Sequence, residues 1–316
     1  MSYELTGIDI AENRLRQNGN LLDILLSDRT SGSNIIWATG SYLTYGAQYA
    51  PDQPMAADQI TGEFGKLIQP RSAKDVSEQR QRTKERGEVF TPLSVVSLMN
   101  SSVDDYPAET EGSRVSWKDF VRERRLEVAC GEAPFIVSRY DPSIEFSRLV
   151  EVKGRVGFLD KKLQVVSAMC PNADEWIKWA TEAFKSSYGY EWQGDSLLIG
   201  RENLLYSFIE HFIDKFSEEP PIAAQESIAH VISWNLFQMD GLKAVIPMSC
   251  HAKQLPVAEN LTLQFFEELP ALPQDENCPG CEFDLVLRHN GLYVQIMDWQ
   301  TNKVERFVDC IADAGS

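Results

Sequence analysis

LEVACGEAPFIVSRYD, residues 126–141, contains the turn on which the fold depends. The apolar run Leu126–Ala129 predicts a strand, and the pair Cys130-Gly131 predicts the turn that ends it. The spacing over Pro134–Tyr140 predicts a helix. A strand that passes through a glycine turn into a helix often binds a nucleotide, but one glycine is too few for the dinucleotide fingerprint G-x-G-x-x-G.

Strands and helices alternate on both sides of this turn. Thr91 as N-cap and Pro92 in the first helical position predict the start of a helix. Further helices are expected over Trp117–Arg124, across 155–185 (two helices), over 195–214 and over Gln225–Trp234. Strands are expected over Tyr188–Glu191 and Asn235–Met239. This alternation predicts an α/β fold with a parallel sheet.

The flanking regions have a different composition, which divides the chain into three parts. Residues 1–85 are rich in turn signals and predict an N-terminal α/β extension, with a helix near 19–28 and one or two strands but no core of its own. Residues 86–245 form the central domain. Residues 246–316 predict a small β appendage, since Asn290-Gly291 lies between alternating apolar positions, a strong hairpin signal.

Composition and charge restrict the class of protein. The 316-residue chain contains six cysteines and no apolar run long enough to span a membrane, so we expect a cytoplasmic protein with reduced thiols and no membrane partner. Its net charge of −17 opposes DNA binding by the chain alone. Residues 66–86 carry seven basic and three acidic residues, which is compatible with a phosphate-facing strip or with a solvated segment of mixed charge.

Carboxylates follow two of the expected strands. Glu191 ends the second strand, where a carboxylate can accept hydrogen bonds from ribose hydroxyls. Asp240 follows the third strand, where it can accept from an exocyclic amine such as that of adenine. Ligands of open α/β sheets bind at the carboxyl ends of the strands, so these positions predict a nucleoside-containing ligand.

Four segments resemble, in order, the motifs of N6-adenine DNA methyltransferases of restriction–modification systems. EVACGEAPF (127–135) is similar to the cofactor motif of an acidic residue, Pro-Ala-Cys-Gly-Ser-Gly and Phe. YGYEWQGDSLLIGRENLL (188–205) resembles the ribose motif, and FQMDGL (237–242) resembles the adenine motif. RGEVFTPLSVVSLM (86–99) resembles the segment that precedes them. The resemblance covers about residues 80–245 and extends to a subgroup that functions as modification subunits.

The resemblance implies a Rossmann-like sheet that binds S-adenosylmethionine. Glu191 would hold the ribose, Asp240 the adenine amine, and Trp192 would either cover the adenine or belong to the core. Cys130 would be a small packing residue. Glu132 and Ala133 replace the Ser and second Gly of the motif, and we expect the added Cβ of Ala133 to crowd the methionine. The implied cofactor-binding residues are Phe90, Thr91, Pro92, Glu127, Cys130, Gly131, Phe135, Glu191, Trp192 and Asp240.

The sequence lacks the (Asn/Asp/Ser)-Pro-Pro-aromatic turn with which this family attacks adenine. Glu219-Pro220-Pro221-Ile222 has neither the amide nor the ring, so a loop is expected there. Asn290 and Tyr293 form either a hairpin or a degenerate catalytic turn. We therefore expect a split enzyme, in which a partner subunit supplies the catalytic turn and DNA recognition. The alternatives are an interaction protein on a degenerate methyltransferase scaffold, and a complete enzyme that uses Asn290 and Tyr293.

The tail also contains candidate metal ligands. Cys278 and Cys281 have zinc-knuckle spacing, and Cys250-His251 is a possible second pair. Structural zinc and reduced surface thiols both fit this pattern. His289 is expected to be an ordinary turn residue.

Overall fold

The computed structural model describes residues 12–74, 79, 83–84, 91–103, 116–250 and 278–314. Its centre is a parallel sheet in the order β1-β2-β3, formed by Arg125–Glu127, Ser187–Glu191 and Leu236–Gln238. The protein is therefore mixed α/β, as expected. Across the sheet, Leu126 pairs with Tyr188, and Tyr190 pairs with Phe237.

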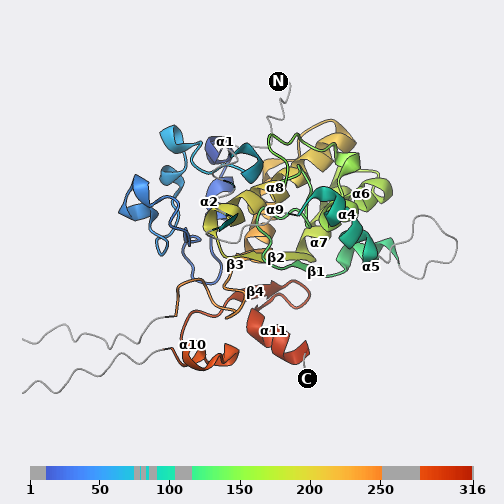
Figure 1. Ribbon diagram of the computed structural model, residues 1–316. Helices are drawn as coiled ribbons and strands as arrows, with labels where there is room; N and C mark the ends of the chain where they lie inside the picture. The colour runs from blue at the N-terminus through green and yellow to red at the C-terminus, as the bar shows by residue number, and fades with distance from the viewer. Residues whose placement is uncertain are drawn as a thin grey trace, which may run out of the picture.

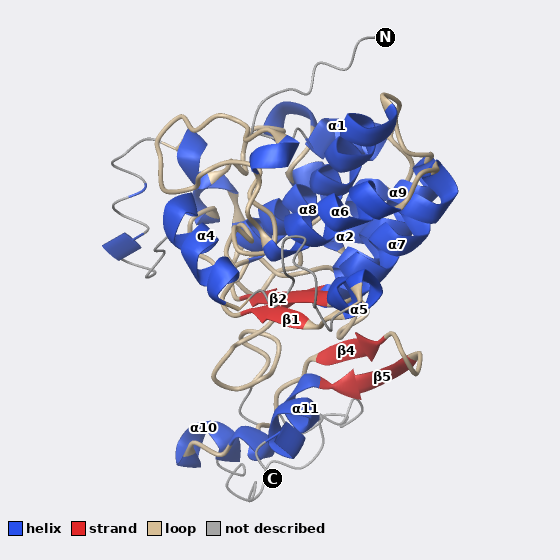
Figure 2. Cartoon of the chain, turned by 90° about the vertical axis from the view of Figure 1, so that its right-hand side faces the viewer, coloured by secondary structure: helices blue, strands red, loops and turns tan. Residues whose placement is uncertain are grey.

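All the helices that connect these strands lie on one face of the sheet (Figures 1 and 2). Right-handed crossovers that always step in the same direction place their helices on the same side. The principal helices of the described residues are α1 Glu12–Gln17, α2 Leu21–Leu26, α4 Leu93–Ser102, α5 Trp117–Arg122, α6 Phe158–Met169, α7 Ala173–Lys185, α8 Gly194–Phe216 and α9 Ile222–Asn235. Single turns of 3-10 helix lie at 43–45, 47–49, 57–59, 62–64, 71–73 and 152–154.

Local chemistry explains where helices begin. Asn172 caps α7 by accepting the N–H of Glu175 at 3.0 Å, and acidic residues fill its first turn. Pro221 precedes α9, so Glu219–Pro221 lie in a loop as expected, whereas Ile222 is the first residue of the helix. The expected Thr91 cap is wrong: α4 starts at Leu93, whose N–H donates to Asp141 Oδ2 at 3.1 Å.

The N-terminal extension packs into the main core through α2 and the segment that follows it. Arg201 of α8, fully buried, donates to the carbonyls of Leu25 and Ser27. The side chain of Gln238 at the end of β3 accepts from the Ile36 N–H and donates to the Ile36 carbonyl, both at 2.8 Å. The helix expected near 19–28 is confirmed. The expected strands are not found among residues 12–74, which contain only isolated bridges.

The tail covers the opposite face of the sheet (Figure 1). It contains α10 Pro279–Phe283, η7 Val286–Arg288, β4 Gln295–Asp298, β5 Lys303–Arg306 and α11 Phe307–Ala314. Tyr190 and Phe237 point to this face, and their rings lie 6.2 and 5.4 Å from that of Phe307. A small second core results, separate from the core beneath the helices.

Two local predictions are wrong. Residues 134–140 form turns and not a helix, because the carbonyls of Phe135 and Ile136 accept the first N–H groups of α6 at 2.8 and 2.9 Å. The hairpin is β4–β5, whose turn contains Asn302 with a positive φ of 54°, and it does not turn at Asn290-Gly291. Among the described helices, none has the length and apolarity needed to cross a bilayer.

Candidate functional site

A cavity of about 1070 Å³ opens at the carboxyl ends of β1 and β2. Its floor consists of the turn that follows β1 and of Glu191–Gln193 after β2. Helix α4 contributes Met99 and Asn100, and the N-terminal extension contributes residues 38–40. The cavity therefore lies where a parallel sheet is expected to bind its ligand, and its volume is at the upper end of the range for small-molecule sites.

The turn after β1 is held by Glu127. Its carboxylate accepts the N–H groups of Phe135 and Ile136 at 3.3 and 3.1 Å. The turn itself carries positive φ angles at Ala129 (49°), Gly131 (54°) and Ala133 (63°). Two of these residues have a Cβ, so the conformation is strained and depends on the contacts around it. Glu127 is thus a positioning residue for the cavity floor.

Glu191 joins the two strand ends. Its Oε2 accepts the Gly131 N–H at 2.8 Å, and its Oε1 accepts the Gln193 N–H at 3.1 Å. Beneath this contact, a Cβ on Gly189 of β2 would lie 2.6 Å from Leu236 and 3.3 Å from the Cys130 sulfur. Glycine at position 189 therefore lets the turn approach the sheet closely enough for Glu191 to reach it.

Burial disfavours ionisation of the carboxyl groups of Glu127 and Glu191. It raises the pKa of Glu127 to about 8, against the lowering effect of the two N–H donors, and the nearby Glu191 raises it further. Burial also raises the pKa of Glu191, again opposed by its backbone donors. The site thus has two interacting acids, and a cation bound between them would favour their charged forms.

The predicted residues of the cofactor motif are brought together here. Glu127, Cys130, Gly131 and Phe135 all line the cavity. Cys130 is buried against β2, and burial raises its thiol pKa well above the ordinary value, which agrees with a packing role. Ala133 does not line the cavity: it is fully buried and faces the helix α8 at Gly200, so the expected crowding of a ligand by its Cβ is not observed.

Glu132 also turns away from the cavity. Its carboxylate accepts the Arg71 N–H at 2.6 Å and the Tyr140 hydroxyl at 2.8 Å. The Asn203 side chain of α8 donates to the Glu132 carbonyl and to the same hydroxyl. The residue that replaces the motif's Ser therefore anchors the turn to α8 and to the N-terminal extension.

The structure describes residues 91–99 of the segment RGEVFTPLSVVSLM (86–99) that precedes the cofactor motif. Thr91 lines the cavity, Pro92 precedes α4 outside it, and Phe90 lies outside the described residues, as does part of the basic run 66–86. Asn100 of α4 donates to the carbonyls of Phe135 and Val156, both at 3.0 Å. This side chain, which no sequence motif singles out, fixes α4 over the turn.

Trp192 forms one wall. Its indole is 38% exposed, lines the cavity and donates from Nε1 to the Ala38 carbonyl at 3.1 Å. Thr39 and Gly40, which were not expected at the site, continue this wall. The only signal was the turn pattern ATGSY, which does not indicate contact with residues some 150 positions further along the chain.

Asp240 is not brought into the cavity. Its Oδ1 accepts the N–H groups of Leu242 and Lys243 at 3.0 and 3.3 Å, and its Oδ2 lies 3.6 Å from Lys243 Nζ. Asp240 is absent from the cavity lining, so it stabilises its own turn.

The remaining candidates gather in the tail. Asn290 donates its N–H to Cys278 Sγ at 3.2 Å, and the Tyr293 hydroxyl accepts from His289 N–H and donates to the Val286 carbonyl. Neither residue lines the cavity. Cys278 and Cys281 lie together with Cys250 and His289. His289 follows η7, and His251 lies outside the described residues.

Comparison with protein-family models, curated proteins and solved structures finds no match to this chain.

Proposed function

We propose that this chain is the S-adenosylmethionine-binding subunit of a split adenine-N6 DNA methyltransferase. The observation that carries the proposal is the contact between the Glu191 carboxylate and the Gly131 N–H at the cavity floor. A carboxylate offers about four acceptor positions. The backbone N–H groups of Gly131, Gln193 and Trp192 interact with this carboxylate, which leaves about one position for a ribose hydroxyl.

The charge and shape of the cavity suit this cofactor. Among the described residues, its charged lining consists of three acids, Glu123, Glu127 and Glu191, and one base, Arg125. S-adenosylmethionine carries a sulfonium and an ammonium group, and either positive charge would favour ionisation of Glu127 and Glu191, whose pKa values burial raises. The half-exposed indole of Trp192 offers a flat apolar surface to the adenine. When bound, the cofactor supplies an electrophilic methyl group, and the chain's own residues hold and orient it.

The edge of the sheet supports the need for a partner. The order β1-β2-β3 corresponds to one half of a doubly wound, Rossmann-like sheet, whose other half begins beside the first strand. Among the described residues, β1 pairs only with β2. Leu126 and Val128 are 41% and 63% exposed there, and both line the cavity. A partner strand next to β1 would cover them and carry the missing Pro-Pro turn into the cavity.

The partner would also account for DNA binding. The target adenine must be flipped out of the duplex, and its amine must be held by acceptors that this sequence lacks. A chain with a net charge of −17 needs positive charge from elsewhere to approach phosphates. We propose that the second subunit supplies the catalytic turn, the DNA-reading surface and this charge.

One observation favours a second candidate, an interaction protein on a degenerate methyltransferase scaffold. Asp240, the acid that the resemblance assigns to the adenine amine, instead binds its own turn and Lys243, outside the cavity. A site without this contact would bind the cofactor weakly or not at all.

Equilibrium binding of S-adenosylmethionine tests the proposal, using the purified chain with and without the product of the adjacent gene. We expect binding, and Glu191→Ala should weaken it by about tenfold or more, since a hydrogen bond to a charged group contributes about 1.5–3 kcal/mol. Glu191→Gln, which keeps the side-chain shape, should lie between. Glu175→Ala, on the exposed surface of α7, is the matched control.

Transfer of labelled methyl groups to DNA separates the two candidates. The proposal expects methylation only when both subunits are present. Binding that leads to no methylation with the partner would favour the scaffold protein. Absence of cofactor binding in both preparations would overturn the proposal.

A further inference from the structure

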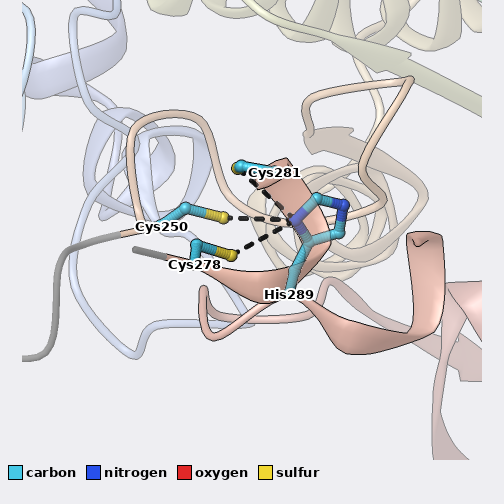
Figure 3. Close-up of side chains that lie close together, drawn as sticks. All are labelled: Cys250, Cys278, Cys281 and His289. Carbon is cyan, nitrogen blue, oxygen red and sulfur yellow. Dashed lines mark hydrogen bonds between the residues drawn. The ribbon is translucent and has the colours of Figure 1, made fainter. Parts of the chain in front are cut away.

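Four side chains from distant parts of the tail converge on one point (Figure 3). The sulfur atoms of Cys250, Cys278 and Cys281 lie 3.7, 3.6 and 3.6 Å from Nδ1 of His289. All four of these atoms lie within 4.8 Å of one another. Cys250 lies in the loop after β3. Cys278 and Cys281 lie at the start of α10 and within it, and His289 follows η7.

These distances match those around a tetrahedral zinc ion. With Zn–S bonds of about 2.3 Å and a Zn–N bond of about 2.0–2.1 Å, a tetrahedral angle separates sulfur from nitrogen by about 3.6 Å. Hydrogen bonding does not explain the arrangement as well, because a neutral imidazole nitrogen has one acceptor position and three thiols point at it. A central cation satisfies all four groups at once.

The surrounding backbone is shaped for this cluster. A Cβ on Gly280 would collide with the ring of His289, and a Cβ on Gly291 would lie 2.8 Å from the Cys250 sulfur. The Asn290 N–H donates to Cys278 Sγ at 3.2 Å. Backbone N–H groups that donate to ligand sulfurs orient them and stabilise their thiolate form. The ammonium group of Lys243 contacts both Asp240 and Cys281 and also lies near Cys250, which places a positive charge beside two of the sulfurs.

We infer that Cys250, Cys278, Cys281 and His289 form a closed, structural zinc site. Three thiolates and one imidazole in tetrahedral arrangement select zinc over hard cations, and four protein ligands leave no position open for a substrate. This site is independent of the proposed methyltransferase activity, because none of its ligands lines the cavity.

The position of the site indicates what the metal does. Between its ligands, Ala244–Ile246 pairs with Leu292–Val294: the Ile246 N–H donates to the Leu292 carbonyl at 2.8 Å, and the Val294 N–H donates to the Ala244 carbonyl at 3.0 Å. Val294 then enters the second core, which covers Tyr190 and Phe237 of the sheet. Zinc joins the two segments at the start of this pairing and so holds the tail on the sheet.

Metal analysis of the full chain tests the inference. The protein is produced in zinc-supplemented medium without a histidine tag and analysed by plasma mass spectrometry. We expect one zinc per chain, reduced to a small fraction in His289→Ala and Cys281→Ser. Cys310→Ser, at an exposed cysteine of α11 away from the cluster, should retain the full amount.

Cobalt substitution gives a readout that needs no variant. Adding Co²⁺ to metal-free protein should produce the intense visible bands of tetrahedral cobalt and the sulfur-to-cobalt charge-transfer absorption, and stoichiometric Zn²⁺ should abolish both. An octahedral cobalt spectrum, one iron per chain in place of zinc, a Cys278–Cys281 disulfide in freshly purified protein, or equal zinc loss in Cys310→Ser would each overturn the assignment.

Discussion

The two faces of the central sheet are covered in different ways. On the helical face, α2 and α6–α9 bury a continuous apolar core that extends into the N-terminal extension. On the tail face, the second core contains six buried hydrophobic residues among those that the structure describes: Phe237, Met239, Ala244, Ile246, Val294 and Val308. A core this small stabilises little by burial alone, and small modules commonly add a metal. On the tail face, metal binding therefore supplies stability that burial of apolar surface supplies on the helical face.

Metal removal should separate the two faces most strongly. After chelation, the amides of Val294 and Phe307 should lose about 100-fold or more of their protection against hydrogen exchange, since a ligand at 100 times its Kd contributes about 2.7 kcal/mol. Amides of α8 should keep theirs, because α8 lies in the other core. The measurement is hydrogen exchange followed by mass spectrometry. An equal loss of protection in both regions would show that the two faces unfold together, which would contradict their separate stabilisation.

Glu210→Ala should show that the helical face depends on buried charge as well as on apolar packing. Glu210 of α8 pairs with Arg139 at 2.7 Å and with Arg155, and all three side chains are at most 3% exposed. Burial acts to raise the pKa of Glu210, but the two guanidinium groups outweigh it and leave this pKa below its ordinary value. Removing the carboxylate leaves two buried cations, which costs about 3–5 kcal/mol of the free energy of unfolding.

The matched control is Glu182→Ala, which removes a partly exposed ion pair with Arg122 and should cost less than about 1 kcal/mol. Urea denaturation followed by tryptophan fluorescence measures both variants. Similar losses in the two would contradict the role given to the buried network.

The pH dependence of stability should reveal Glu127 on the helical side. Its pKa is about 8 in the folded protein and 4.5 in the reference state, so between these values the folded chain holds a proton that the unfolded chain has released. The free energy of unfolding therefore falls as the pH rises from about 4.5 to about 8. Glu127→Gln should remove this fall, a difference of about 5 kcal/mol at most. Glu175→Gln serves as the control, and an unchanged slope in Glu127→Gln would exclude this role.

Tyr188→Phe should have the smallest effect and should act on the tail face alone. The Tyr188 hydroxyl donates to the Met297 carbonyl of β4 at 3.4 Å, which is long for a hydrogen bond. Its loss should cost about 0.5 kcal/mol, at the low end for such a contact. Hydrogen exchange in β4 is the measurement, and a change in α8 amides would be unexpected.

Elements whose determinants lie within one segment could be predicted from the sequence. The three strands and the helices α6–α9 follow from periodicity and caps within each segment, and their expected positions are confirmed to within a few residues. The helix expected over residues 134–140 does not form, because their N–H groups donate to side chains outside the segment. Glu127 accepts two of these N–H groups, and Asp160 accepts that of Ser138 at 2.7 Å. Local helical spacing carries no information about such partners.

The candidate sites show the same limit. Strand-end logic found Glu191 and the turn after β1, because parallel strands place their carboxyl ends together. It also selected Asp240, whose carboxylate accepts N–H groups of its own turn and does not line the cavity. In the tail, adjacency in sequence suggested the pair Cys250-His251, whereas the structure brings Cys250 to His289, 39 positions away. Only the folded tail reveals that pairing.

The contacts of Arg201 have a consequence for the time course of folding in the cell. Leu25 and Ser27 depend on a guanidinium that is synthesised more than 170 residues later, and Ile36 depends on Gln238, 202 positions away. At a translation rate of about 5–20 residues per second, the N-terminal segment waits roughly 10–40 s for its partners. During that interval its leucine-rich helix is without the surface that buries it. Residues 21–26 therefore keep apolar side chains exposed until the core that buries them in the folded protein has been synthesised.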